Sequence, residues 1–237
     1  RTDADRLSQF GAGNIAVTGS VKFDITPPDE AVEKGKLLKK CIGNRPVLMC
    51  ASTRDGEENL ILDALDHLDK RALLLLVPRH PQRFSEVADQ IQARKIRMMK
   101  RSQLQNLSSD IIPDDVRILL GNSMGEMFMY YAACDVAFIG GSLLKLGGQN
   151  LIEASALGKP VLIGPHTFNF EAITKDAISA GAAIRIQTAS EMMTEADKLF
   201  SQDTSRSEMG IKAQAFAQNQ HGATDRTMAL LAPLLEK

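Results

Sequence analysis

The chain has 237 residues and a formal net charge of −1, so it is long enough for one large domain or two small ones. The balanced charge gives no whole-chain reason to expect nucleic acid as a partner, and no apolar run approaches the roughly 20 residues of a membrane helix. Three cysteines without metal-ligand spacing predict buried free thiols in a reducing compartment. The chain starts without Met, inside a helical pattern and without a signal-peptide core, so we expect a soluble fragment of a longer protein.

The leading residues are predicted to be separate from the main domain. Residues 1–10 fit the end of a helix, and residues 15–19 fit a short strand. Pro27 and Pro28 then interrupt the chain before a helical pattern over residues 29–41. We therefore place a boundary at the prolines, with a leading remnant over residues 1–26 and the main domain over residues 27–237.

From Pro46 onward, short apolar runs alternate with longer amphipathic ones, which is typical of βαβ units and a parallel sheet. Strands are predicted at residues 47–52, 72–77, 96–100, 116–120, 135–139, 160–163 and 182–186. Helices are predicted between them at residues 56–68, 81–93, 125–134, 149–157 and 170–180, and a helical cap at residues 190–200, 205–219 and 224–235. The pattern indicates a Rossmann-like α/β fold with helices on both faces of the sheet, which binds ligands at the carboxyl ends of its strands.

The loop after the first strand, residues 52–58, has two interpretations. Ser52 or Thr53 is placed to cap the next helix, with acids in its first turn, and this alone explains the residue types. A loop that contacts a ligand explains them equally well.

The loop after the second strand, residues 78–83, holds an Arg-His pair between two prolines. Prolines fix the backbone on both sides, which favours a preset anion site with Arg79 as the fork and His80 as a further candidate. The alternative is a solvated basic turn.

After the fourth strand, Ser123 and Glu126 have the spacing of a capping box, so helix capping explains both side chains. Gly125 is then expected inside the first helical turn, where glycine costs about 1 kcal/mol relative to alanine. This cost suggests that a ligand or another strand approaches the backbone closely. A phosphate that rests on the amides of residues 124–126 would use this glycine.

The stretch from Gly140 to Pro165 contains a second helix start. The pair Gly147-Gly148 is expected to bring the backbone close to a ligand. Asn150 and Glu153 stand three residues apart, so they are predicted on one face of the first turn of the helix that follows.

Together these strand ends suit a nucleotide, with its phosphate on Arg79 and backbone amides and its ribose hydroxyls on Glu153. Neither glycine stretch gives GxGxxG with an acid about twenty residues later, and GxxxxGK[ST] is absent. These absences disfavour NAD and P-loop nucleotides. The four histidines show no metal-ligand spacing.

The sequence also resembles a known family over almost its whole length. The resemblance lies in the order and spacing of DADRLSQFGA, VTGSVKFD, ASTRDGEE, VPRHPQRF, GNSMGEMFMYYAACDVAFIGGSL and GGQNLIEASALGKPVLIGPHTFNF. These segments are similar to the C-terminal domain of the 3-deoxy-D-manno-octulosonic acid (Kdo) transferases of lipopolysaccharide synthesis. The resemblance implies the C-terminal half of a GT-B fold, which holds the donor CMP-Kdo.

The resemblance also implies which residues contact the donor. The expected CMP contacts are Pro78, Arg79, Met124, Gly125, Glu126, Asn150, Leu151, Ile152 and Glu153. Ser52, His80 and Gly148 are further candidates. The family often has His where this chain has Arg54 and Gln149, and the effect of these two departures stays open.

By the same resemblance, the full enzyme transfers Kdo with inversion from CMP-Kdo to a lipid A precursor at the cytoplasmic face of the inner membrane. The family's N-terminal half carries the membrane anchor, the acceptor site and the catalytic carboxylate base. We therefore expect no catalytic base, cofactor or metal in these residues, and no activity from this chain alone. Two alternatives remain open: a GT-B transferase or epimerase that uses a UDP-sugar, and a non-enzymatic nucleotide-sensing module.

Overall fold

The computed structural model describes residues 2–235, so residues 1, 236 and 237 of the predicted ranges lie outside it. Its centre is one parallel sheet of seven strands in the order β3-β4-β2-β1-β5-β6-β7. The prediction of a Rossmann-like sheet with these seven strands is confirmed. The strands are β1 (Val47–Thr53), β2 (Leu73–Pro78), β3 (Met98–Lys100), β4 (Ile118–Leu120), β5 (Val136–Ile139), β6 (Val161–Ile163) and β7 (Ala183–Arg185).

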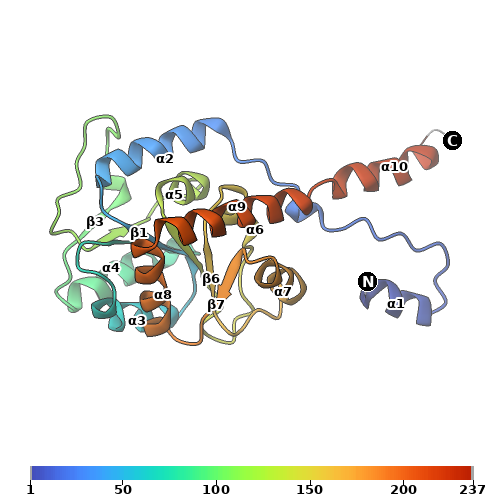
Figure 1. Ribbon diagram of the computed structural model, residues 1–237, viewed down its shortest axis with the longest axis horizontal. Coiled ribbons are helices and arrows are strands. Elements are labelled where there is room, and N and C mark those ends of the chain that lie inside the picture. The colour runs from blue at the N-terminus through green and yellow to red at the C-terminus, as the bar shows by residue number, and fades with distance from the viewer. Residues whose placement is uncertain (1, 236–237) are drawn as a thin grey trace.

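Both faces of the sheet are covered by helices (Figure 1). Successive residues of β1 alternate between the two cores, with Met49 in one and Leu48 in the other, as the two-residue period of a strand requires. One face carries α2 (Asp29–Ile42), α5 (Met127–Ala133), α6 (Ile152–Ala156), α7 (Glu171–Ser179) and α9 (Asp203–Asn219). The other carries α3 (Glu57–Asp63), α4 (Phe84–Ala93) and α8 (Ala189–Ser201).

Helices α2 and α5 pack unusually closely. A Cβ atom added at Gly35 of α2 would lie 2.3 Å from the Cβ atom of Ala132 and 2.6 Å from the carbonyl oxygen of Met129, both on α5. Gly35 therefore lets the two helix backbones approach each other. This contact fixes α5, which follows the loop predicted to bind phosphate.

The C-terminal residues predicted as a helical cap do form helices, but only the last of these helices lies away from the sheet. Helices α8 and α9 pack on opposite faces, whereas α10 (Ala223–Leu235) projects from the domain (Figure 1). The carboxylate of Asp24 accepts hydrogen bonds from the amides of Gly222 at 2.7 Å and Thr224 at 2.6 Å, at the start of α10. The leading segment is thus tied to the last helix, and the boundary at residues 26 and 27 stays a prediction.

Several local predictions were wrong. Residues 15–19 form no strand, because no neighbouring strand lies there to pair with them; this segment connects α1 (Thr2–Gln9) to the short 3-10 helix η1 (Val21–Phe23). The helices expected from residues 125 and 149 begin later, at Met127 and Ile152, and are only seven and five residues long. The helix predicted over residues 56–68 splits into α3 and η2 (Leu65–His67); the remaining 3-10 turns are η3 (Pro81–Arg83) and η4 (Arg101–Gln103).

Within residues 2–235, no helix is both long and apolar enough to cross a membrane. The three cysteines, Cys41, Cys50 and Cys134, are buried and free.

Candidate nucleotide-binding site

The carboxyl ends of the central strands meet at one edge of the sheet. Thr53, the last residue of β1, is the register partner of Pro78, the last residue of β2. On its other side β1 pairs with β5, which comes much later in the chain. The strand order therefore reverses at β1, and in open α/β sheets such a switch point is where ligands bind.

Among the predicted site residues, Arg79 and Glu153 have charged side chains that form no hydrogen bond with the described part of the protein. Arg79 directly follows β2, and its exposed guanidinium has no hydrogen bond or ion pair within the described residues. The carboxylate of Glu153 is half-buried and likewise has no hydrogen-bond partner there. Burial raises the pKa of Glu153, and the positive charge of Arg79 acts in the opposite direction. The pair thus offers a cation and an unused acceptor within electrostatic range of each other.

Glu126 holds the loop before α5, and both oxygens of its carboxylate accept hydrogen bonds from other side chains. It receives hydrogen bonds from the Arg101 guanidinium at 2.8 Å, from the Tyr130 hydroxyl at 3.3 Å and from the Ser123 hydroxyl. The predicted capping box is wrong, because the Ser123 side chain bonds to this carboxylate and α5 has no side-chain cap. Any contact of Glu126 with a ligand would therefore use its backbone.

Gly125 lies before α5 and outside its first turn. Its φ of +76° favours glycine, and nothing lies within 4 Å of an added Cβ, so the turn alone explains this residue. The amides of residues 124–126 donate to no acceptor in the described part of the chain. They remain free to bind an anion, beside the exposed side chain of Met124.

Contacts within the protein also explain the conformation of the segment before α6. A Cβ atom at Gly147 would lie 2.1 Å from the side-chain amide nitrogen of Asn169, so this glycine makes room for a neighbouring loop. Gly148 donates its amide to the Gly141 carbonyl at 2.6 Å. Asn150 precedes the helix, contrary to the prediction, and its side-chain oxygen accepts the Ile152 amide at 3.0 Å.

Some of the proposed donor contacts can act only through their backbone. Leu151 and Ile152 are fully buried in the core, and Pro78 is buried at the end of β2. His80 is half-buried beside Arg79. Ser52 adopts a φ of +54° at an irregularity in the pairing of β1 with β2, so the backbone at this strand end departs from regular strand geometry.

Two buried glutamates near β1 were missed by the sequence analysis. Glu57 accepts hydrogen bonds from the amides of Arg54 at 2.9 Å, Gly141 at 2.6 Å and Leu143 at 2.9 Å, and burial raises its pKa. Both capping predictions for this loop were wrong, because the residue before α3 is Gly56 and makes no side-chain cap. Glu57 instead joins the loops that follow β1 and β5.

Glu58 anchors the loop after β2. Its carboxylate accepts the Thr53 hydroxyl at 2.8 Å and the Arg83 guanidinium at 2.8 Å and 2.9 Å. The only signal in the sequence was a pair of acids shortly after one apolar strand and an arginine shortly after the next, 25 residues later.

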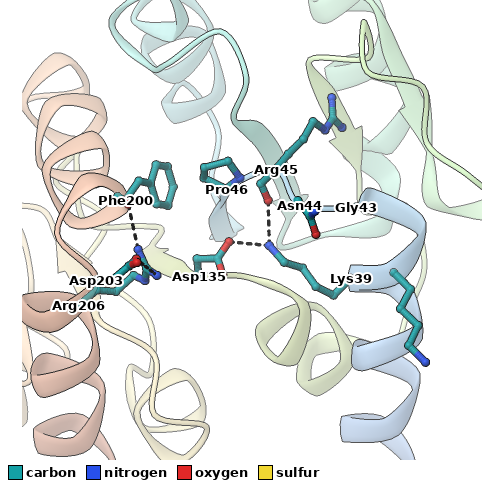
Figure 2. Close-up of a pocket in the computed structure, with 10 residues that line it drawn as sticks. Lys39, Gly43, Asn44, Arg45, Pro46, Asp135, Phe200, Asp203 and Arg206 are labelled. Carbon is teal, nitrogen blue, oxygen red and sulfur yellow. Dashed lines mark hydrogen bonds and ion pairs between the residues drawn. The ribbon is translucent and has the colours of Figure 1, made fainter.

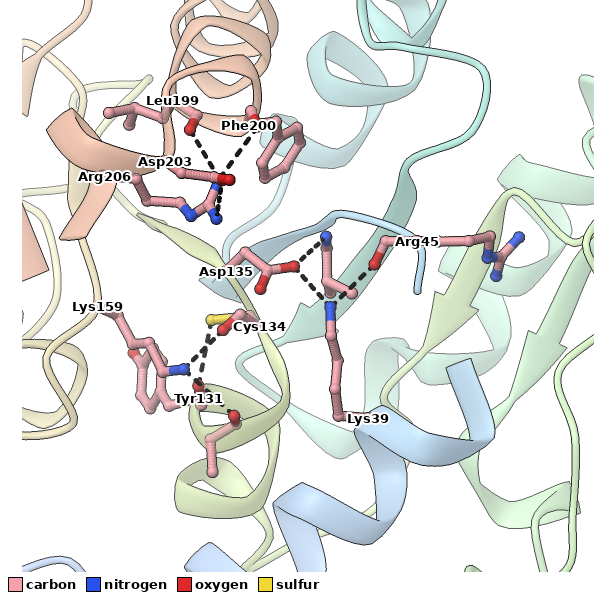
Figure 3. A network of polar contacts seen from close by, with 12 residues as sticks. Lys39, Arg45, Tyr131, Cys134, Asp135, Lys159, Leu199, Phe200, Asp203 and Arg206 are labelled. Carbon is pink, nitrogen blue, oxygen red and sulfur yellow. Dashed lines mark hydrogen bonds and ion pairs between the residues drawn. The ribbon is translucent and has the colours of Figure 1, made fainter. Parts of the chain in front are cut away.

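A cavity lies at the opposite, amino-terminal edge of the sheet (Figure 2). Its volume is about 580 Å³, and it lies between the end of α2, the start of β1 and the α8–α9 connection. Lys39 bonds to Asp135 at 2.7 Å and to the Arg45 carbonyl at 2.9 Å, while Arg206 binds the carbonyl of Phe200 at 3.1 Å (Figure 3). These charges satisfy one another and join element ends, so we assign the ligand site to the carboxyl edge.

The chain was compared with known proteins. It is 44% identical over 98% of its length to the 3-deoxy-D-manno-octulosonic acid transferase of Bordetella pertussis, and 34% identical over 94% to that of Haemophilus influenzae. It covers 55% and 52% of those two proteins, so it spans about half the length of these relatives. No protein-family model matches the chain.

Solved structures give the class of fold. The C-terminal CMP-Kdo binding domain of WaaA from Acinetobacter baumannii matches 80% of this chain and 98% of that domain, with 31% identity and a TM-score of 0.73. Anabaena Alr3699/HepE, in complex with UDP and glucose, shares 17% identity, covers 92% of this chain and 55% of its own, and has a TM-score of 0.60, which supports the fold alone.

The sheet, its switch point and the helical C-terminal end are those of a GT-B glycosyltransferase C-terminal domain. Within that class, the chain belongs to the Kdo transferase family. In the described residues, no group of three or more His, Cys, Asp or Glu side chains is arranged to hold a metal ion.

Proposed function

We propose that this chain binds CMP-Kdo and is the donor half of an enzyme that transfers Kdo to a lipid A precursor. The A. baumannii domain that it matches is described as binding CMP-Kdo, and the relatives are Kdo transferases. The observation that carries the proposal is the pair formed by Arg79 and Glu153, one exposed and one half-buried, both without a partner at the switch point of the sheet.

The two side chains suit different parts of a nucleotide. A guanidinium offers a planar fork of donors that matches a phosphate, whereas a carboxylate accepts from the two hydroxyls of a ribose. The free amides of residues 124–126 would add further donors to the phosphate. Asn150 keeps its amide NH2 group available, since only its oxygen is used by Ile152.

These groups would assist the reaction by stabilising the leaving group. When the bond between the sugar and the phosphate oxygen breaks, negative charge grows on the phosphate, and donors already aimed at it stabilise that charge. Because α5 and α6 have only seven and five residues, Arg79 and the loop amides would contribute more than the helix dipoles. The base that activates the acceptor hydroxyl would come from the half of the relatives that this chain does not span.

The rest of the proposal concerns the full-length protein. It would act in lipopolysaccharide synthesis at the cytoplasmic face of the inner membrane, and would contact the membrane and the lipid acceptor through that other half. The donor needs no metal or further cofactor in this scheme.

Calorimetry with CMP and UDP tests the proposal. We expect CMP to bind more tightly than UDP, and Arg79→Ala and Glu153→Ala each to weaken CMP binding about ten- to a hundredfold, because a hydrogen bond to a charged group contributes about 1.5–3 kcal/mol. Arg97→Ala and Glu208→Ala are matched controls on exposed residues away from this edge, and should leave the affinity unchanged.

Other outcomes favour other functions. Tighter binding of UDP than of CMP would favour a UDP-sugar enzyme. A full-length protein that binds CMP-Kdo but releases no CMP in the presence of the lipid acceptor would favour a nucleotide-sensing module.

A further inference from the structure

Two of the arginines that the structure describes differ from the others in having no polar partner within the described residues. Every other arginine in residues 2–235 has a hydrogen bond, ion pair or other polar interaction with the protein. The side chains of Arg54 and Arg79 have no hydrogen bond or ion pair there. Their positive charges are therefore available to a ligand.

The two free arginines are neighbours at the switch point of the sheet. Arg54 follows Thr53 at the end of β1, and Arg79 follows Pro78 at the end of β2; Thr53 and Pro78 are register partners. Neighbouring strands lie about 4.8 Å apart, so the two residues leave the sheet side by side. Asp55 and Glu58 pair with Arg83, and Glu57 binds backbone amides, whereas Glu153 lies within electrostatic range of Arg79 but forms no bond with it. Such an arrangement suits a ligand with two negative charges.

Arg54 lies on the side of this pair that faces β5. Its Cγ atom is 3.5 Å from the position of a Cβ atom added at Gly141, and the side-chain amide nitrogen of Gln149 is 3.3 Å from the same point. The Glu57 carboxylate holds the amides of Arg54 and Gly141, so the backbones that carry this corner are fixed before any ligand binds. Arg54 and Gln149 are thus two polar groups at one preformed corner.

We propose that Arg54 binds the carboxylate of the donor sugar, with the Gln149 amide beside it, and so selects an acidic sugar. This inference rests on the proposed function. The transferred sugar is an octulosonic acid, so the donor carries a carboxylate as well as the phosphate that links it to cytidine. Arg79, which lies within electrostatic range of Glu153, binds the phosphate. Two anionic groups then meet two free guanidinium groups, each of which can bind its partner with two hydrogen bonds.

The test separates the sugar from the nucleotide. Binding of CMP, of CMP-Kdo and of a CMP-Kdo analogue with a carboxamide in place of the carboxylate is measured for the parent chain, Arg54→Gln and Arg54→Lys. Arg54→Gln should leave CMP affinity within about twofold and weaken CMP-Kdo about ten- to a hundredfold. The parent chain should bind the carboxamide analogue as weakly as Arg54→Gln binds CMP-Kdo. Arg54→Lys should keep part of the preference, because it keeps the charge.

The analogue also tests the proposal without any substitution. Lys145→Gln, which removes an exposed charge from the loop after β5, is the matched control and should bind all three ligands as the parent does. Equal binding of CMP-Kdo and its carboxamide by the parent chain would overturn the role of Arg54. So would an equal loss of CMP and CMP-Kdo affinity in Arg54→Gln, which would make Arg54 a phosphate ligand. Failure of the parent chain to bind CMP would instead contradict the proposed function.

Discussion

Three glutamates near the carboxyl edge of the sheet differ in what their carboxylates do. Glu57 and Glu126 are bonded to backbone amides or to side chains of the protein, whereas Glu153 has no such partner in the described residues. A half-buried carboxylate without a partner lowers stability, so its presence is best explained by a ligand that supplies the missing donors. Glu153 is thus the candidate ligand-binding acid, and the other two are structural.

This difference predicts that substitution of the two residues affects stability differently. Glu126→Ala removes the ion pair with Arg101 and the bond from Ser123, so we expect it to lower the free energy of unfolding by about 1–3 kcal/mol and to weaken CMP binding through the loop. Glu153→Ala should weaken CMP binding with no loss of stability. Denaturant titration and calorimetry on both variants provide the comparison; a Glu126→Ala chain with parental stability would contradict it.

The pH dependence of both properties follows from the raised pKa of Glu153. A protonated carboxyl accepts hydrogen bonds from the ribose hydroxyls more weakly than a carboxylate does, so CMP affinity should fall as the pH drops, starting above the ordinary pKa of 4.5. The pKa of Glu153 is higher in the folded chain than in the unfolded chain. The stability that its protonated form contributes is therefore present below pH 4.5 and is lost as the pH rises through the folded pKa. The unliganded Glu153→Gln chain should therefore melt at a higher temperature than the parent at neutral pH.

Glu153→Gln also serves as the control for the phosphate group of CMP, whose own titration is common to both chains. Parallel pH profiles of CMP affinity for the parent and the variant would rule out a role for this carboxylate.

At the scale of elements, the site depends on how its loops are supported. Helix α5 follows the loop of residues 124–126, which is proposed to bind phosphate, and rests on α2 through Gly35. The loops after β1 and β5 are joined by Glu57, and the loop after β2 is joined to α3 by Glu58. The site residues are therefore placed by contacts between elements, and the short helices contribute little to their own positions.

The contact of α2 with α5 predicts a sensitive position. Gly35→Ala places a methyl group 2.3 Å from the Cβ atom of Ala132 and should lower the free energy of unfolding by about 1–3 kcal/mol, since the two helices have to move apart. Gly13→Ala is the control, because nothing lies within 4 Å of an added Cβ there. Equal stability of the two variants, measured by denaturant unfolding, would show that the helices adapt without cost.

The anchor of α10 predicts an acid-sensitive helix. Backbone and side-chain hydrogen bonds from the start of α10, chiefly from Thr224, lower the pKa of Asp24 from 3.8 to about 2. With a lowered folded pKa, the stabilisation is present above 3.8 and is lost as the pH falls towards 2. Asp24→Ala should reduce hydrogen-exchange protection of the α10 amides at neutral pH and leave the sheet unchanged. Unaltered protection of α10 would mean that this carboxylate does not hold the helix.

At the scale of the whole molecule, the sequence predicts the sheet well and the site loops less well. Each residue of β2 is buried, so an apolar run alone identifies the strand. The start of α5 depends on the left-handed turn at Gly125, and the burial of Glu57 depends on amides 84 and 86 residues later in the chain. Long-range contacts of this kind leave no periodic signal in the sequence. The family, in contrast, followed from the order of its motifs.

The length of the chain also predicts its behaviour in an assay. It spans about half the length of these relatives, and the proposed site offers groups for the donor but no proposed base for the acceptor. With CMP-Kdo and a lipid A precursor, this chain alone should bind the donor and release no CMP, whereas the full-length protein should turn over. Release of CMP by the chain alone, at a rate above spontaneous hydrolysis of the donor and dependent on the acceptor, would contradict this division.

The central proposal is that the carboxyl edge of this sheet holds CMP, and a crystal structure of the chain with CMP tests it most directly. We expect the phosphate on Arg79 and the amides of residues 124–126, with the ribose hydroxyls on the carboxylate of Glu153. Nucleotide bound elsewhere, for example in the cavity between Lys39 and Arg206, or CMP at this edge without contact to Arg79 and Glu153, would contradict the assigned site.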